Sequence, residues 1–272
     1  MSCFSLKRWV WACAPSLLLL GARLCAMGDA PKRVLVLDSF GRDVAPYSAI
    51  VSSFRTTLAR EIGAGADIYI YEESLEMGWF PDPAFEQRST ILLEQRFADR
   101  PLDLIVPIGS PACRLAMQSN AKLFTSAPIL CLGADQRLVP LESLRTNSTL
   151  ITQNIHPPDM IEDILQLKPD TTNIVVVLGS SPLEKFWADQ CRREWQPLAP
   201  RVSFSWLDNL SLKQITRKVQ TLPPHSSILF LMLILDADGV PYDQDEPLKL
   251  IHAAASAPIF GYFRSRFGQG NG

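Results

Sequence analysis

The amino-acid sequence predicts an α/β protein of two similar lobes, each a parallel sheet flanked by helices. The chain has 272 residues, of which 47% are hydrophobic and 20% charged, so it can bury a sizeable core. Short continuous apolar runs, typical of strands buried on both faces, alternate with segments of helical periodicity. This order runs once to about residue 140 and starts again near residue 157.

The charge balance argues against a nucleic-acid partner. The formal net charge is −2 at pH 7, with a pI of about 6.0. A nucleic-acid-binding surface needs an excess of basic residues, so we expect no nucleic-acid partner. The chain has 3 histidines, which argues against a histidine-rich metal centre.

Residues 1–26 have the organisation of a secretory signal peptide. Lys7 and Arg8 precede an apolar run over residues 9–20, and Ala26 offers a cleavage site. The run is shorter than the ~20 residues of an ordinary membrane span. We therefore expect export to a periplasmic or other extracytoplasmic space. The alternative is an uncleaved N-terminus that tethers the protein to the membrane.

Cleavage after residue 26 changes both the charge and the cysteine count. The mature chain keeps 23 basic and 28 acidic residues, a net charge of −5. Three cysteines remain, Cys113, Cys131 and Cys191, so at most one intramolecular disulfide can form. Apolar neighbours of Cys113 and Cys131 favour buried thiols. Neither a CxxC motif nor a metal-ligand spacing is present, so we expect no metal and no cofactor.

The N-terminal lobe, residues 31–140, is predicted from four apolar runs and the helical segments between them. Apolar residues recur at four-residue steps from Ile50 to Ile62, which places them on one helix face. Asp82 is a favourable N-cap with Pro83 at the first helical position. The predicted strands are 33–39, 67–71, 102–108 and 127–132, and the predicted helices are about 46–62, 83–99 and 112–120.

The C-terminal lobe, residues 157–272, repeats the pattern after a polar stretch over 141–156 that we interpret as a hinge or linker. The apolar run at 228–235 is far shorter than a membrane span and suits a buried central strand. The predicted helices are about 157–167, 182–195, 211–220 and 245–255, and the predicted strands are 172–178, 201–206, 226–235 and 258–261.

The carboxyl ends of the predicted strands are the expected ligand site, as in other open α/β sheets. Several of these ends are Gly-Ser or Gly-Ala turns that open helices, where backbone N–H groups and the helix dipole favour an anion such as a carboxylate. The same residues are also ordinary helix-entry residues, but they recur in both halves. The candidate ligand-binding residues are Ser39, Phe40, Gly109, Ser110, Pro111, Gly133, Ala134, Gly179, Ser180, Ser181 and Asp236.

Signals for catalysis or metal binding are poor. The sequence has no nucleophile-elbow, zinc-protease or phosphate-loop motif. Its histidines lie in unrelated contexts, so a hydrolase or transferase that uses Ser110 or Ser180 remains a minor alternative. The acidic segment 236–246 is similar to a calcium loop, but its glycine is at the fourth position instead of the sixth.

Three segments resemble one family of proteins. They are RVLVLDSFGRDVAPY at residues 33–47, IGSPA at 108–112 and IFGYF at 259–263. They are similar to periplasmic substrate-binding domains of the uncharacterised ABC-transporter type. They are most similar to the version that forms the extracytoplasmic sensor region of bacterial histidine kinases. Over residues 32–270 the resemblance implies a type I periplasmic-binding-protein-like fold with a ligand between its lobes.

The resemblance also implies site positions and a departure from the family. The family's pocket positions match Ser39, Gly109, Ser110, Pro111, Gly133, Ala134, Gly179, Ser180 and the segment around Asp236. The family's fold usually continues beyond the strand that matches residues 259–262. We therefore expect an incomplete C-terminal lobe and a truncated copy.

These observations lead us to expect a ligand-binding module instead of an enzyme. The expected ligand is a small organic molecule such as an amino acid or a carboxylate. The leading hypothesis is a sensor input domain that acts with a membrane histidine kinase. The close alternative is the soluble substrate-binding component of an ABC importer, with a permease as its partner.

Overall fold

The first sheet is formed by the N-terminal part of the chain. The structure is a computed structural model that describes residues 31–41, 46–62, 67–77, 82–242 and 245–261. The predicted signal peptide lies outside these described residues. The strands are β1 (Lys32–Asp38), β2 (Ile68–Ser74), β3 (Leu104–Ile108), β4 (Ile129–Ala134) and β5 (Ser148–Thr152), and they pair in parallel in the order β2-β1-β3-β4-β5.

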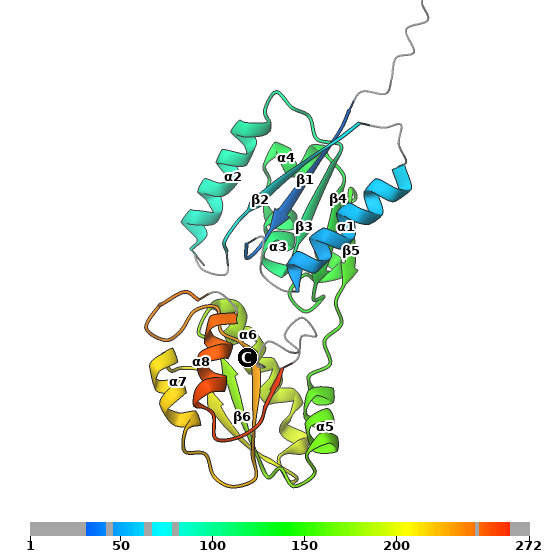
Figure 1. Ribbon diagram of the computed structural model, residues 1–272. Coiled ribbons are helices and arrows are strands. Elements are labelled where there is room, and N and C mark those ends of the chain that lie inside the picture. Colours follow the sequence, from blue (N-terminus) through cyan, green and yellow to red (C-terminus); the bar gives the residue numbers. More distant parts are fainter. Residues whose placement is uncertain (1–30, 42–45, 63–66, 78–81, 243–244, 262–272) are drawn as a thin grey trace, which may run out of the picture. The chain divides into compact units, whose positions relative to one another are not determined.

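Helices cover both faces of this sheet (Figure 1). They are α1 (Tyr47–Ile62), α2 (Pro83–Phe97), α3 (Ser110–Gln118) and α4 (Lys122–Ser126). Successive strand residues point to opposite faces. Leu35 and Leu37 therefore pack in the cluster that contains α2, α3 and α4, whereas Val34 and Val36 pack in the cluster that contains α1. The continuous apolar sequence of β1 follows from this burial on both faces.

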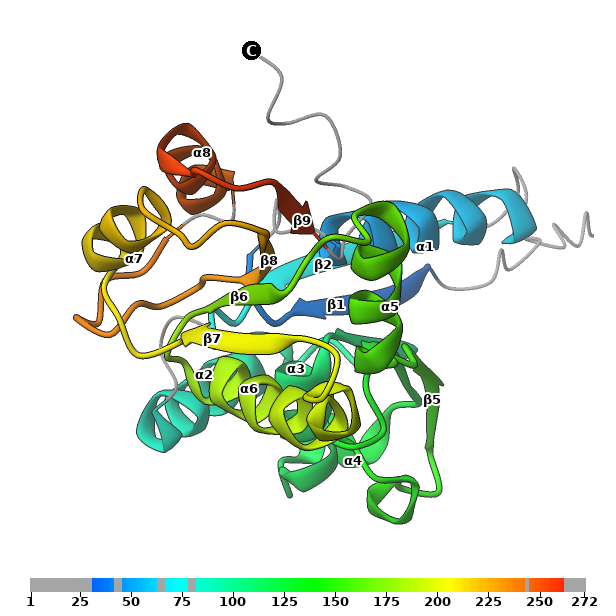
Figure 2. The same ribbon diagram turned by 90° about the horizontal axis from the view of Figure 1, so that it is seen from below.

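The second sheet has the order β7-β6-β8-β9 and is also parallel. Its elements are α5 (Pro157–Leu167), β6 (Asn173–Leu178), α6 (Pro182–Glu194), β7 (Ser203–Leu207), α7 (Leu212–Val219), β8 (Ser226–Met232), α8 (Asp245–Ala254) and β9 (Ile259–Gly261). Figure 2 shows α7 and α8 on one side of this sheet and α6 on the other. Ile174 and Val176 pack in the cluster that contains α5 and α6, and Val175 and Val177 in the cluster that contains α7 and α8.

The predicted α/β architecture with two parallel sheets is confirmed, and each predicted strand and helix has a counterpart in the structure. Asp82 accepts a hydrogen bond from Ala84 N at 3.0 Å and caps α2 as expected. Ser181 and Ser211 each start a helix through reciprocal bonds with the side chain three residues later. Among the described residues, no helix has the length and apolar character needed to span a membrane.

Five elements differ from the predictions. Strand β5 lies inside the predicted hinge 141–156. It is an edge strand whose residues are alternately half-buried and exposed, although its sequence STLIT does not alternate in polarity. Strand β8 ends at Met232, earlier than expected. It ends there because the backbone N–H groups of Ile234 and Leu235 donate to the carboxylate of Glu184. Helix α4 and two 3-10 turns, η1 (Leu141–Ser143) and η2 (Gln196–Leu198), were not expected from the sequence.

Candidate ligand-binding site

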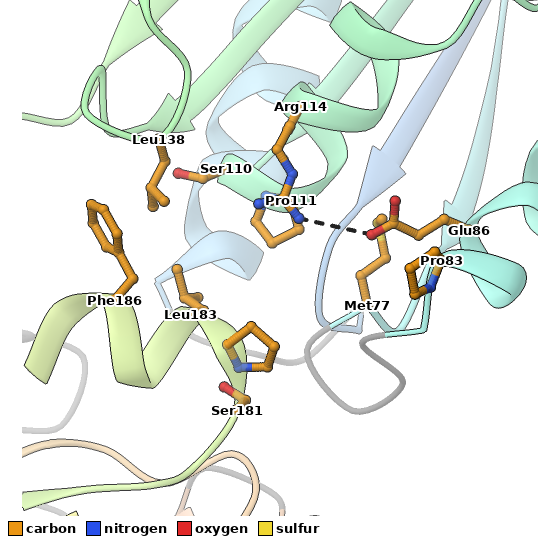
Figure 3. Close-up of a pocket in the computed structure, with 11 residues that line it drawn as sticks. Met77, Pro83, Glu86, Ser110, Pro111, Arg114, Leu138, Ser181, Leu183 and Phe186 are labelled. Carbon is orange, nitrogen blue, oxygen red and sulfur yellow. Dashed lines mark ion pairs between the residues drawn. The ribbon is translucent and has the colours of Figure 1, made fainter.

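A pocket of about 380 Å³ joins the starts of α3 and α6 (Figure 3). Its volume falls in the range of small-molecule sites. One side of the pocket is formed by the starts of α2 and α3 and by loop residues that follow β2 and β4. The start of α6 forms the other side. The pocket is lined by Met77, Pro83, Glu86, Ser110, Pro111, Arg114, Leu138, Ser181, Pro182, Leu183 and Phe186.

Ser110, the first residue of α3, has a hydroxyl at the pocket wall. Its Oγ accepts a hydrogen bond from Asp135 N at 3.2 Å, and the residue is 8% exposed. A hydroxyl that accepts one hydrogen bond retains its O–H proton as a donor. Arg114 lies one turn further along α3, so helical periodicity places it on the face of Ser110. The wall at α3 therefore combines a hydroxyl donor, a guanidinium and the positive end of the helix dipole.

Arg114 faces Glu86, which α2 contributes to the same pocket. Arg114 Nη2 lies 3.8 Å from Glu86 Oε1, longer than a hydrogen bond, and both side chains are partly exposed. This loose pair leaves donors on the guanidinium and acceptors on the carboxylate available to a ligand. Met77, Leu138, Leu183 and Phe186 line the rest of the pocket with apolar surface. The pocket therefore offers one cation, one anion and an apolar wall.

Ser39 supports this wall from beneath. The residue is fully buried, and its Oγ donates to Ile108 O at 2.6 Å and accepts from Ala112 N at 3.0 Å. It thus ties the end of β1 to the end of β3 and the start of α3. Gly109, with φ +83°, lies beside it, and a Cβ there would be 2.9 Å from Ser39 Oγ. This conformation and this lack of space favour glycine.

Gly133 and Ala134 end β4 beside these residues. Gly133 has φ +64°, and a Cβ there would be 2.6 Å from Ile50 Cδ1. Ala134 is fully buried, and its carbonyl accepts from Gln153 N at 3.0 Å. Both residues shape the strand end from which Asp135 reaches Ser110.

Phe40 follows the end of β1 and is 1% exposed. Its ring stacks on Tyr47, with centroids 4.7 Å apart. Ile234, which follows β8, is the other fully buried member of this small cluster, and Leu183 and Met232 pack against it. Since Leu183 also lines the pocket, the cluster connects the end of β1 to the pocket wall at α6.

Asp38 holds the turn that carries Phe40. Its Oδ1 accepts from Phe40 N at 2.7 Å and Gly41 N at 2.8 Å, whereas its Oδ2 has no hydrogen-bond partner among the described residues. The residue is 4% exposed. Burial raises the pKa of Asp38 above its ordinary value of 3.8, the two backbone N–H groups oppose that shift, and the charge of Glu72 adds to it.

This raised pKa predicts a specific pH dependence. Because the folded protein binds the Asp38 proton more tightly than the unfolded chain, Asp38 stabilises the fold most below pH 3.8. That contribution is lost as the pH rises through the raised pKa. The substitution Asp38→Asn removes the titration. We expect the free energy of unfolding of the variant, minus that of the wild type, to increase over this interval in urea titrations. A difference that is constant or falls with pH would contradict the assignment.

Glu184 occupies the anion-binding position that the sequence predicted for a ligand. It lies on α6 and is fully buried. Its Oε1 accepts from Gly179 N at 3.2 Å and Ile234 N at 2.6 Å, and its Oε2 accepts from Ser181 N at 2.9 Å and Leu235 N at 3.4 Å. Burial raises the pKa of Glu184, and these N–H groups oppose the shift. The chain's own carboxylate therefore satisfies the N–H groups that end β6 and follow β8.

Gly179 makes this arrangement possible because it has no side chain. A Cβ on residue 179 would lie 2.4 Å from both Glu184 Oε1 and Leu235 O. We expect Gly179→Ala to destabilise the protein by about 1–3 kcal/mol in urea unfolding, because the carboxylate or the backbone must move. Gly261→Ala is the control, since nothing lies within 4 Å of a Cβ there. Equal effects of the two substitutions would contradict this explanation.

Ser180 and Asp236 are also engaged within the second sheet's loops. Ser180 Oγ donates to Asp208 O at 3.2 Å. Asp236 is 2% exposed. Its carboxylate accepts from Leu212 N at 3.0 Å, Asp238 N at 2.9 Å, Val240 N at 3.0 Å and Tyr242 OH at 3.1 Å. Burial, followed by this hydrogen bond, raises the pKa of Tyr242 to about 12.

Arg137 connects the segment after β4 to α6. Its Nε and Nη2 donate to the two carboxylate oxygens of Asp135, each at 2.9 Å. Its Nη1 donates to Glu194 Oε1 and its Nη2 to Ile155 O, each at 2.6 Å, and its guanidinium lies 4.9 Å from the ring centre of Trp187. The hydrogen bonding that Arg137 donates to the Asp135 side chain is the largest of the effects that raise the pKa of Arg137.

The structure divides the predicted site residues into two groups. Ser110, Pro111 and Ser181 line the pocket. The others support its surroundings: Ser39, Phe40, Gly109, Gly133 and Ala134 near the first sheet, and Gly179, Ser180 and Asp236 near the second. The sequence reasoning missed Glu86 and Arg114. The signal for Arg114 was its position one turn after the predicted start of a helix at a strand end.

The described residues offer little support for serine-dependent catalysis or for metal binding. His156 pairs with Asp159 and His225 with Asp170, and within the described part of the chain no hydrogen bond joins a histidine to Ser110 or Ser180. The described residues contain no group of three acidic, cysteine or histidine side chains suited to a metal ion.

A larger groove of about 850 Å³ runs along α1, β4 and β5. Glu61 is the one charged side chain among its described lining residues. It therefore offers less to orient a polar ligand than the pocket at α3 and α6.

Comparison with known proteins supports the fold. No protein-family model matches the chain, and the search of curated proteins gives no match. The ABC domain in complex with L-Trp from Streptococcus pneumonia matches with a TM-score of 0.60 and 15% identity, over 87% of this chain and 75% of that one. A conserved domain protein from Vibrio cholerae matches with a TM-score of 0.58 and 14% identity, over 87% and 75%.

A ligand-free, open substrate-binding protein with adhesive properties from Clostridium difficile is also similar. Its TM-score is 0.56 at 13% identity, over 85% of this chain and 74% of that one. The shared features are the two parallel sheets and the helices that flank them. The chain therefore has a type I periplasmic-binding-protein-like fold.

Proposed function

We propose that the protein binds a zwitterionic amino acid with an apolar side chain in the pocket at the starts of α3 and α6. One observation carries this proposal: the described residues that line the pocket include a single arginine and a single glutamate, whose Nη2 and Oε1 atoms lie 3.8 Å apart, beside an apolar wall. A free amino acid carries the complementary set of a carboxylate, an ammonium and a side chain. The volume of about 380 Å³ suits a ligand of this size.

The carboxylate of the ligand would bind at α3. Glu184 already accepts the N–H groups at the start of α6, so that side of the pocket has little capacity for a second anion. Arg114, the Ser110 hydroxyl and the dipole of α3 remain. Glu86 would accept from the ammonium, and Leu138, Leu183 and Phe186 would cover the side chain.

Binding would bias a conformational equilibrium. The ligand would contact α2 and α3 on one side and α6 on the other, so it would favour the arrangement in which these helices enclose it. Within the predicted hinge, residues 141–156, the segment 153–156 between β5 and α5 connects the parts of the chain that carry these helices. We propose a sensor input role, in which this change is passed to a membrane histidine kinase. That role rests on the sequence resemblance over residues 33–47.

Transport is the second candidate. The similar solved structures include a protein named as substrate-binding and another named as an ABC domain. In this role the protein would be exported and would deliver the amino acid to an ABC permease. A permease gene and an ATPase gene beside this one would favour transport, whereas a longer reading frame that encodes a kinase would favour the sensor role.

A thermal-shift screen of the free amino acids tests the proposed ligand class. A ligand at 100 times its Kd adds about 2.7 kcal/mol of stability, equivalent to a rise of about 5–10 °C in Tm for a chain of this size. We expect apolar or aromatic amino acids to give the rise, and their decarboxylated amines to give none. The absence of a shift with any amino acid would overturn the proposal.

A further inference from the structure

Two free, buried thiols lie in one hydrophobic cluster beneath the pocket wall. Cys113 lies on α3 and Cys131 on β4, and both are fully buried in the same hydrophobic cluster. On β4, Ile129 and Cys131 pack into that cluster, whereas Leu132 packs into the cluster that contains α1. The strand alternation therefore points Cys131 toward α3.

The sulfur of Cys113 lies close to this strand. Cys113 Sγ donates to Pro107 O on β3 at 3.4 Å. The register of β3 and β4 pairs Ile105 with Ile129 and Ile108 with Leu132, so Pro107 lies beside Cys131. These contacts place the two thiols side by side between α3 and the sheet. Cys191 lies in the separate cluster that contains α5 and α6, so the third cysteine of residues 31–272 has a different environment.

We propose that Cys113 and Cys131 form a disulfide when the chain folds in an oxidising compartment. Each thiol loses its proton and together they lose two electrons as the S–S bond forms. A disulfide of low molecular mass, such as oxidised glutathione, accepts the two electrons and two protons and becomes two thiols. Because both sulfurs are fully buried in the folded protein, the exchange takes place during folding. The proposal rests on the export expected from residues 1–26.

This disulfide would fix the geometry of the binding pocket. It would join the first turn of α3, which carries Ser110, to the strand that ends at Ala134, one residue before Asp135. Ser110 Oγ and Asp135 N are already hydrogen-bonded to one another at 3.2 Å. A covalent bond between α3 and β4 would hold this contact and reduce the freedom of the unfolded chain.

Peptide-resolved thiol labelling tests the proposal without any ligand. The full chain is unfolded in urea under reducing conditions and refolded into a glutathione redox buffer, and a cooperative thermal transition verifies folding. Free thiols are then alkylated in denaturant and located by mass spectrometry before and after reduction. We expect Cys113 and Cys131 to be labelled only after reduction, and Cys191 to be labelled in both cases. Reduction should lower Tm by about 5–10 °C.

Single variants identify the pairing. In Cys113→Ala we expect Cys131 to be labelled before reduction, and in Cys131→Ala we expect the same of Cys113. Cys191→Ala should leave the protected pair unchanged. Labelling of both Cys113 and Cys131 before reduction in the folded wild type would overturn the proposal. So would protection of Cys113 that persists in Cys131→Ala. Because labelling needs no ligand, failure here is distinguishable from failure of the amino-acid proposal.

Discussion

Replacing Glu184 with alanine is expected to destabilise the protein by about 3–5 kcal/mol. The substitution removes the acceptor for the backbone N–H groups of Ser181, Ile234 and Leu235, and one of the two acceptors of Gly179 N, the other being Met232 O. These groups lie where the side chain of Glu184 is fully buried, so they would lose their hydrogen bonds without gaining full access to water. Urea unfolding of the variant and the wild type measures the loss.

Glu162→Ala on α5 is the matched control. That glutamate is exposed and pairs with Arg201, so its loss should cost about 0–1 kcal/mol. Glu184→Gln should also destabilise the protein, because the amide NH2 would replace one oxygen and face N–H donors. A loss in Glu184→Ala no larger than that of Glu162→Ala would show that the buried carboxylate is not an organising feature of the second sheet.

Arg137→Met should cost about 2–4 kcal/mol, the second largest effect that we expect. Methionine keeps a side chain able to pack on Trp187 but removes every guanidinium bond. The carboxylate of Asp135 is 5% exposed, so it would remain buried without its cation. The hydrogen bonds that this side chain donates to Glu194 of α6 and to Ile155 O would be lost at the same time. Urea unfolding again provides the measurement.

Arg192→Met is the matched control, because it makes the same arginine-to-methionine change at an exposed site. Arg192 also lies over a tryptophan, with its guanidinium 4.4 Å from the ring centre of Trp206, and pairs with Asp189 and Asp208. Its side chain is 40% exposed, so we expect a loss of about 0–1 kcal/mol. Similar losses in the two variants would contradict a special role for Arg137.

Patterns that depend on local sequence predicted most of the fold. The apolar runs of β1 and β6 report burial on both faces, and Asp82 with Pro83 marks the start of α2. Strand β5 escaped prediction because its sequence, STLIT, lacks the alternation of polar and apolar residues that marks a half-buried strand. Local sequence patterns therefore predicted buried strands and helix starts. They did not predict a strand whose character depends on its position at the edge of the sheet.

The candidate site was only partly predictable for a similar physical reason. The Ser181-x-x-Glu184 spacing is a recognisable helix start, yet nothing local shows that Ile234 and Leu235 also bond to Glu184. Glu86 and Arg114 lie on different helices, and only the folded chain brings them to one pocket. A binding site formed by residues so far apart in the sequence can be recognised only in the folded structure.

Calorimetric titration of the amino acid that gives the largest thermal shift tests the central claim most directly. The wild type, Arg114→Gln and the control Arg88→Gln are compared, since Arg88 is an exposed arginine of α2 that is not among the residues lining the pocket. We expect Arg114→Gln to weaken binding about 10- to 100-fold, the value of a hydrogen bond to a charged group, and Arg88→Gln to leave Kd unchanged. Equal affinity in Arg114→Gln and the wild type would contradict binding in this pocket.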